Sequence, residues 1–134
     1  MEIITKEFHR RQDCRGALTF LEGERDIPFL IKRIYYIYGV AHGERRGFHA
    51  HKTLQQYLIC VHGQCTVMLD DGLEQKKVVL REPHVGLYVG PGIWHEMYDF
   101  SEDAVLLVAA SAYYDEKDYI RNYEQFQAYV SNGG

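Results

Sequence analysis

The chain has 134 residues, of which 46% are hydrophobic, and a formal net charge of −4 with both signs mixed along its length. This composition suits one folded domain and offers no broad basic surface for nucleic acid. The longest apolar run, 104–110, is too short to cross a bilayer, and the first residues do not read as a signal peptide. We therefore expect a single domain over residues 1–134 in the cytoplasm, with neither a membrane nor a nucleic-acid partner.

Short runs rich in β-branched and aromatic residues alternate with turn residues along most of the chain. Runs of this kind, closely spaced and without repeats or linkers, are typical of a β-sandwich or barrel. Turns are predicted at Asp71–Gly72, Glu82–Pro83 and Pro91–Gly92. The predicted strands are Ile3–Phe8, Ala17–Glu22, Phe29–Tyr38, Gly47–His51, Gln55–His62, Gln64–Asp70, Gln75–Leu80, His84–Val89, Ile93–Phe100 and Ala104–Ala110.

The strand Phe29–Tyr38 carries polar and aromatic side chains on alternate positions. Arg33, Tyr35 and Ile37 share one face, because successive side chains of a strand point to opposite sides. Composition alone does not decide which face points inward.

The segment Tyr114–Val130 differs from the rest, because its large apolar side chains recur at helical spacing. Acidic residues near its start and Gly133 beyond its end favour one amphipathic helix. Its aromatic stripe is expected to pack on the β-body rather than to bind a ligand. The stripe consists of Tyr119, Tyr123, Phe126 and Val130.

The three cysteines, Cys14, Cys60 and Cys65, do not have zinc-ribbon spacing. Cys60 and Cys65 are predicted to face each other across a hairpin that turns at His62–Gly63, where a disulfide is conceivable. A cytoplasmic setting favours free thiols.

Two histidines at alternate positions, His49 and His51, project from the same side of a predicted strand. A later segment, Gly86–His95, can bring a third imidazole to the same place. Ionisable groups of this kind are rarely buried without a function, so the pair is a candidate site.

The spacing around these histidines resembles the two sequence motifs of the cupins. Gly43, His49, His51 and Gly63 follow the first motif. The segment Gly86–His95 follows the second, except that Gly90 stands where the first proline is expected. Where a metal-binding cupin has a carboxylate, this chain has Gln55 and Gln56, and a neutral amide does not offset a divalent charge. We therefore expect a site without metal or cofactor, although three histidines and water can hold zinc.

Arginines lie close to the histidine segment and suggest an anionic ligand. Arg33 and Arg46 are candidate phosphate contacts, because guanidinium groups pair with phosphate oxygens. Tyr35 can stack on a base or hydrogen-bond to a phosphate. Arg45 is expected to be solvent-exposed charge.

Beyond these patterns, the chain resembles the dTDP-4-keto-6-deoxyglucose 3,4-ketoisomerases, which are metal-independent cupins. The matching segments run over nearly the whole chain, and the RGFHAH and WHEM pieces are the most specific. They are Asp13–Gly16, Ile27–Ile37, Arg46–Lys52, Val85–Pro91, Trp94–Met97 and Tyr113–Arg121.

This resemblance implies an all-β cupin jelly roll with a C-terminal helix, a homodimer, and a dTDP-linked 4-keto-6-deoxy sugar as substrate. The keto group would move from C4 to C3 through an enediol. His49 would remove the C3 proton and His51 would relay a proton between the two oxygens. Arg33, Tyr35 and Arg46 would contact the nucleotide. Arg15 and His95 resemble the type that forms the galacto product and complete the predicted catalytic set.

Three alternatives remain open from the sequence. A 3,5-epimerase of the same nucleotide sugar would also exchange the C5 hydrogen. A metal-dependent cupin oxygenase would require a stoichiometric metal ion. A non-catalytic sensor would bind dTDP without turnover.

Overall fold

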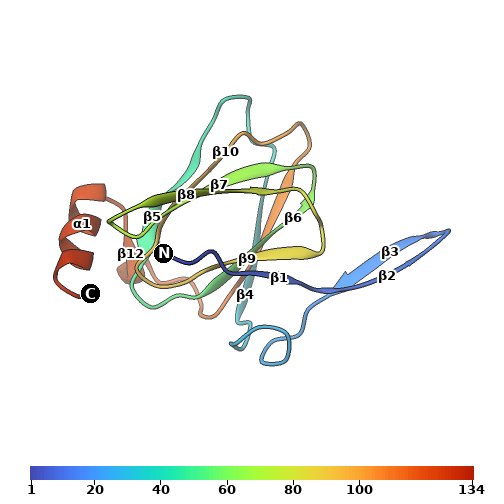
Figure 1. The fold of residues 1–134 in the computed structure, drawn as a ribbon, viewed down its shortest axis with the longest axis horizontal. Coiled ribbons are helices and arrows are strands. Elements are labelled where there is room, and N and C mark those ends of the chain that lie inside the picture. Colours follow the sequence, from blue (N-terminus) through green and yellow to red (C-terminus); the bar gives the residue numbers. More distant parts are fainter.

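The computed structural model describes residues 1–134 as two antiparallel five-stranded sheets, a separate two-stranded hairpin and one C-terminal α-helix (Figure 1). The first sheet has the order β1-β9-β6-β11-β4 and the second β12-β5-β10-β7-β8. The predicted all-β architecture with a C-terminal helix is confirmed. The strands are β1 Thr5–Glu7, β2 His9–Asp13, β3 Gly16–Phe20, β4 Arg33–Tyr38, β5 Arg46–His51, β6 Gln56–His62, β7 Cys65–Asp70, β8 Gln75–Leu80, β9 Val85–Val89, β10 Trp94–Tyr98, β11 Val105–Ala110 and β12 Tyr119–Ile120.

The main hydrophobic core is built from inward-facing side chains of both sheets. Leu58 of β6, Val67 of β7 and Val108 of β11 are each at most 1% exposed. Full burial of an aliphatic side chain of this size contributes about 1.5–3 kcal/mol. The core therefore holds the two sheets together while their edge strands remain free to line a site.

Strand β4 lies at the edge of the first sheet and shows the predicted alternation. Arg33, Tyr35 and Ile37 are half-buried, whereas the residues between them are exposed. The structure thus assigns the Arg33 face to the interior. The strand begins at Arg33 rather than at Phe29, which is buried in a separate cluster with Phe8 and Tyr57.

A hairpin of β2 and β3 extends away from the two sheets (Figure 1). The sequence predicts β3, at slightly different bounds, but not β2. Strand β2 consists of five exposed residues, HRRQD, and carries no alternation of apolar and polar positions. An isolated two-stranded hairpin is marginally stable in water.

The predicted hairpin between β6 and β7 is wrong, because the two strands belong to different sheets. The turn after His62 carries the chain from one sheet to the other. Cys60 and Cys65 are both buried in the core as free thiols.

The predicted helix over Tyr114–Val130 is also too long. The α-helix α1 covers Tyr123–Ser131, and a short 3-10 turn, η1, covers Glu116–Asp118. Asn122 caps α1 by accepting a hydrogen bond from the Gln125 amide at 3.0 Å. Phe126 buries the helix against the second sheet, so packing was the correct role for this part of the stripe.

The structure has no helix with the length and apolar character needed to span a membrane.

Candidate active site

Three histidine rings meet on the neighbouring strands β5 and β10 of the second sheet. His49 and His51 lie on β5, and their ring centroids are 5.0 Å apart, which confirms that they share a face. His95 lies on β10 directly opposite His49 in the strand pairing, with ring centroids 4.6 Å apart. Strand register therefore brings the predicted third imidazole to the pair.

An irregularity in β5 sets the position of His49. The β5–β10 register shifts between His95 and Glu96, and both Gly47 and Phe48 have positive φ, at 95° and 60°. A Cβ atom on Gly47 would lie 2.8 Å from the His95 carbonyl oxygen, so only glycine fits there. Such a bulge typically re-aims the side chain next to it, here His49.

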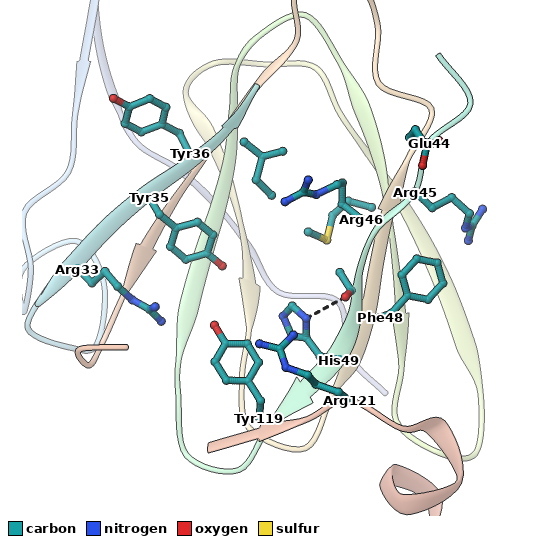
Figure 2. Close-up of a pocket in the computed structure, with 13 residues that line it drawn as sticks. Arg33, Tyr35, Tyr36, Glu44, Arg45, Arg46, Phe48, His49, Tyr119 and Arg121 are labelled. Atoms are coloured by element: carbon teal, nitrogen blue, oxygen red, sulfur yellow. Dashed lines mark hydrogen bonds between the residues drawn. The ribbon is translucent and has the colours of Figure 1, made fainter. Parts of the chain in front are cut away.

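A cavity of 570 Å³ opens between β4 and β5, in front of His49 (Figure 2). The predicted nucleotide contacts Arg33, Tyr35 and Arg46 all line it. Figure 2 shows the Tyr35 and Arg46 side chains directed between the two strands, whereas Phe48 and Arg45 point elsewhere. The outward direction of Arg45 agrees with its ion pair to Glu96 at 2.9 Å.

The other two histidines lie deeper. His51 does not line the large cavity but a separate, smaller cavity of 60 Å³. His95 is 1% exposed and lines neither cavity. Of the three rings, His49 is therefore the one that faces the large cavity.

Burial keeps all three imidazoles neutral at neutral pH. It lowers the pKa of His49 and lowers that of His95 strongly. Burial lowers the pKa of His51 to about 3, reinforced by repulsion from the protonated form of His49 and from the charges of Arg33 and Arg121. Neutral imidazoles can accept protons, which is the state that a general base requires.

Backbone carbonyls orient two of the rings. His49 Nδ1 lies 3.0 Å from the Gly47 carbonyl oxygen, and His95 Nδ1 lies 3.1 Å from that of Ile93. Since a carbonyl only accepts, the neutral rings carry their proton on Nδ1. Nε2 of His49 is therefore left with a free lone pair.

The cluster meets the distance requirement of a metal site, because one nitrogen from each ring lies within 4.8 Å of the others. Its donor set contains no carboxylate. Gln56, which is fully buried, instead accepts a hydrogen bond from the Tyr35 hydroxyl, and Gln55 accepts one from Tyr88 at 2.9 Å. The amides predicted to replace the metal-binding carboxylate thus serve to hold tyrosines.

Arg15 is the predicted catalytic residue that the structure does not bring to this cavity. It lies at the tip of the β2–β3 hairpin, exposed and paired with Asp13 at 3.0 Å. Within one chain, Arg15 therefore does not take part in the site.

Tyr119 and Arg121 also line the cavity, and the sequence patterns did not indicate either residue as part of the site. Tyr119 lies on β12 opposite His51, with ring centroids 4.4 Å apart, and was wrongly placed on the packing face of a helix. The Arg121 guanidinium stacks on Tyr119 at 4.2 Å and pairs with Glu116 at 2.8 Å. Asn122, with Gln125 three residues later, is a capping signal that marks the true start of the helix. This signal would have placed Tyr119 and Arg121 before the helix rather than in it.

Comparisons with known proteins find similarity over nearly the whole chain. The family model described as "FdtA: WxcM-like, C-terminal" matches residues 1–131. A relative from Aneurinibacillus thermoaerophilus, named TDP-4-oxo-6-deoxy-alpha-D-glucose-3,4-oxoisomerase, is 52% identical over 131 residues, which cover 98% of this chain and 94% of the relative.

Solved structures of sugar ketoisomerases have the same fold. QdtA from Thermoanaerobacterium thermosaccharolyticum, in complex with TDP, is 47% identical with a TM-score of 0.96, over 98% of this chain and 96% of that chain. WlaRA from Campylobacter jejuni, a TDP-fucose-3,4-ketoisomerase, is 36% identical with a TM-score of 0.91, over 98% of both chains.

The fold and the matches together define the class as a cupin-like sugar-nucleotide 3,4-ketoisomerase, as the sequence predicted. Within that class, the chain belongs to the FdtA, WxcM-like family.

Proposed function

We propose that this enzyme moves the keto group of dTDP-4-keto-6-deoxyglucose from C4 to C3 through an enediol, and that it acts in the cytoplasm without a metal ion. The observation that carries the proposal is the position of His49, a neutral imidazole with a free Nε2 at the wall of a cavity of 570 Å³. A cavity of this size is typical of small-molecule sites.

The reaction needs proton transfers at two neighbouring carbons. The C4 ketone acidifies the C3 hydrogen, and His49 Nε2 removes it. His51 takes the proton of the C3 hydroxyl and delivers one to the C4 oxygen, after which His49 returns its proton to C4. No proton is gained or lost overall. General acid–base catalysis of this kind contributes about 10²–10⁴-fold.

The nucleotide is held by the cationic wall of the cavity. Arg33 and Arg46 are both available to diphosphate oxygens, and Tyr35 lies beside Arg33, whose guanidinium is 5.2 Å from the Tyr35 ring centroid. Binding energy from the diphosphate, away from the reacting ring, positions C3 and C4 near the histidines.

Arg15 acts, in this proposal, from a second copy of the chain. The β2–β3 hairpin that carries it is exposed and lies apart from both sheets, with Leu18 57% exposed. Strand β4 also exposes large side chains on its outer face, including Tyr36 and Tyr38. A homodimer would cover these surfaces and could place Arg15 in the partner's cavity.

We propose that Arg15 and His95 together favour the galacto configuration at C4, so that the product is dTDP-3-keto-6-deoxygalactose.

The test is incubation with dTDP-4-keto-6-deoxyglucose in deuterium oxide, followed by proton NMR of the product. We expect a 3-keto sugar of galacto configuration with its C5 hydrogen retained. Exchange at C5 would instead indicate a 3,5-epimerase, and dTDP binding without turnover would indicate a sensor. A 3-keto product of gluco configuration would overturn only the assignment of Arg15 and His95.

A further inference from the structure

A carboxylate lies against His51, the second histidine of the proposed reaction. Asp118 Oδ2 is 3.4 Å from His51 Nδ1. His51 is 2% exposed, and neither of its ring nitrogens has a hydrogen-bond partner. A buried imidazole with both nitrogens unpartnered is unusual, because each unpaired polar atom costs free energy. The arrangement therefore calls for an explanation.

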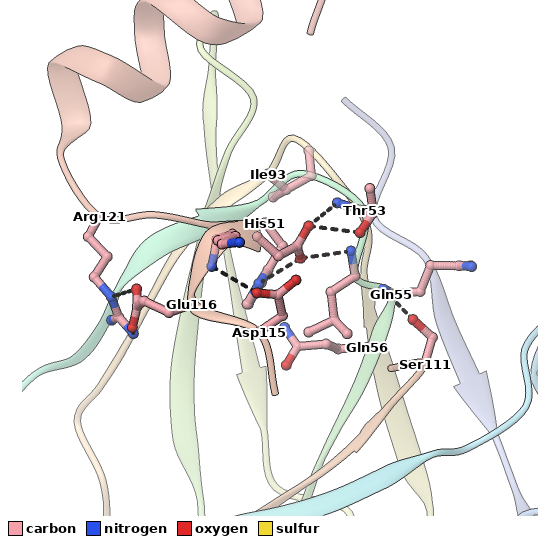
Figure 3. Close-up of polar contacts among 12 residues, drawn as sticks. His51, Thr53, Gln55, Gln56, Ile93, Ser111, Asp115, Glu116 and Arg121 are labelled. Atoms are coloured by element: carbon pink, nitrogen blue, oxygen red, sulfur yellow. Dashed lines mark hydrogen bonds and ion pairs between the residues drawn. The ribbon is translucent and has the colours of Figure 1, made fainter. Parts of the chain in front are cut away.

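The Asp118 carboxylate is itself firmly held by the segment that begins at Thr53, which lies beside His51 in Figure 3. It accepts hydrogen bonds from the Thr53 amide at 2.8 Å, the Thr53 hydroxyl at 2.7 Å and the Leu54 amide at 3.2 Å. The Asp118 carbonyl oxygen in turn accepts from the Lys52 amide at 2.9 Å. These contacts fix the carboxylate to the segment that directly follows His51.

We propose that Asp118 is a positioning residue for His51. Its carboxylate accepts the Nδ1 proton of the ring, which fixes the tautomer and leaves Nε2 free to relay a proton between the C3 and C4 oxygens. This inference rests on the proposed ketoisomerase reaction. A contact of 3.4 Å needs only a small ring movement to reach hydrogen-bond length, and catalytic contacts are often loose before the substrate binds.

Charge explains why His51 needs such a partner. The groups around its ring are His49, Arg33 and Arg121, which all disfavour the imidazolium that forms during the relay. Asp118 supplies the opposing negative charge in direct contact. In the step, Nε2 takes the proton of the C3 hydroxyl, Asp118 stabilises the cation, and the same proton passes to the C4 oxygen.

The alternative role for Asp118 is structural, because its contacts with Thr53 and Leu54 would anchor β12 to β5 in any case. The two roles predict different tautomers of His51. Long-range ¹⁵N–¹H NMR on the ¹⁵N-histidine-labelled wild-type protein, without substrate, measures the tautomer directly. We expect Nδ1–H with unprotonated Nε2, and a ring protonated on Nε2 alone would overturn the proposal. This measurement does not depend on turnover, so its failure is distinct from failure of the proposed reaction.

The Asp118→Asn variant adds a kinetic readout. The amide oxygen can still accept from Thr53. The NH₂ group, in the place of Oδ2, would lose the hydrogen bond from the Leu54 amide, donate to His51 Nδ1 and force the opposite tautomer. We expect kcat to fall roughly 10²–10⁴-fold with little change in KM, because His51 acts in the transition state. The control is Asp115→Asn, because that side chain caps η1 by accepting from the Lys117 amide at 3.1 Å and asparagine also caps. A folded Asp118→Asn enzyme with native kcat and the native His51 tautomer would contradict the proposal.

Discussion

Three neutral imidazoles are packed together in this site, and that charge state follows from their surroundings. Desolvation is the largest cause of the lowered pKa at each of the three rings. Two rings donate Nδ1–H to backbone carbonyls, which leaves their Nε2 atoms as acceptors. Neutral rings suit the proton transfers that we propose for His49 and His51 better than the binding of an anion by protonated histidines.

The lowered pKa of His49 predicts the acidic limb of the pH profile. A general base must be unprotonated, so activity rises as pH increases through its pKa. Because burial places that pKa below the ordinary 6.5, kcat/KM should stay high somewhat below pH 6.5. Initial rates between about pH 4.5 and about pH 8.5, roughly two units either side of the ordinary histidine pKa, measure this limb. A half-maximal point at or above 6.5 would be incompatible with His49 as a buried base.

Metal removal is the corresponding test of the histidine cluster. The three rings are close enough for a cation, but the cluster offers no carboxylate to offset a divalent charge. We expect activity to survive dialysis against a strong chelator. Elemental analysis of the purified protein is the check, and one zinc or iron per chain, required for activity, would replace this mechanism with a metal-assisted one.

The bulge in β5 connects strand geometry to catalysis. Gly47 has φ of 95°, packs against β10 and presents its carbonyl oxygen to His49 Nδ1. Strict strand alternation predicted the shared face of His49 and His51 correctly, but it could not reveal the bulge. The bulge depends on pairing with β10, a segment more than 40 residues further along the chain, which is a tertiary effect.

Gly47→Ala should damage both stability and activity. The new Cβ would meet the His95 carbonyl oxygen at 2.8 Å, in a backbone conformation that disfavours alanine. We expect a loss of about 1–3 kcal/mol in the free energy of unfolding and a displaced His49. Urea denaturation and kcat measure the two effects. Gly39→Ala is a matched control, because Gly39 also has positive φ, at 66°, but nothing lies within 4 Å of its Cβ position. If both variants lost equal activity, the contact with β10 would not be the cause.

The C-terminal segment shows where sequence patterns gave the wrong element. Aromatic spacing predicted one helix, yet Tyr119 pairs with β5 and Asp118 binds the backbone of Thr53 and Leu54. These long-range contacts override local helical preference, as tertiary context often does. The sequence therefore indicated the histidines and the cavity arginines Arg33 and Arg46, but not Tyr119 or Asp118.

The molecule as a whole has a feature that a single chain does not explain. The β2–β3 hairpin exposes apolar side chains and carries Arg15 away from the cavity of its own chain. Its polar strand β2 gave no sequence signal, because its residues contact no core of the same chain. The homodimer and the single domain both remain predictions. The homodimer can be tested through Arg15, which the hairpin carries.

Mixing two variants that each lack galacto-forming turnover tests the dimer and the role of Arg15 together. Arg15→Ala chains retain His49, and His49→Asn chains retain Arg15. If Arg15 enters the partner's cavity, random mixed dimers should recover about a quarter of the native sites. Light scattering should give twice the 15.7 kDa of one chain. The control is each variant mixed with itself. A monomeric mass, or no recovery from variants that do form mixed dimers, would remove Arg15 from the site.

The most direct test of the account is turnover by the His49→Asn variant at saturating dTDP-4-keto-6-deoxyglucose, with dTDP affinity from calorimetry as its control. Loss of the base should lower kcat by at least about 10²-fold while dTDP binding stays nearly unchanged. Turnover within a few-fold of the native rate would contradict the assignment of His49 as the base that removes the C3 hydrogen.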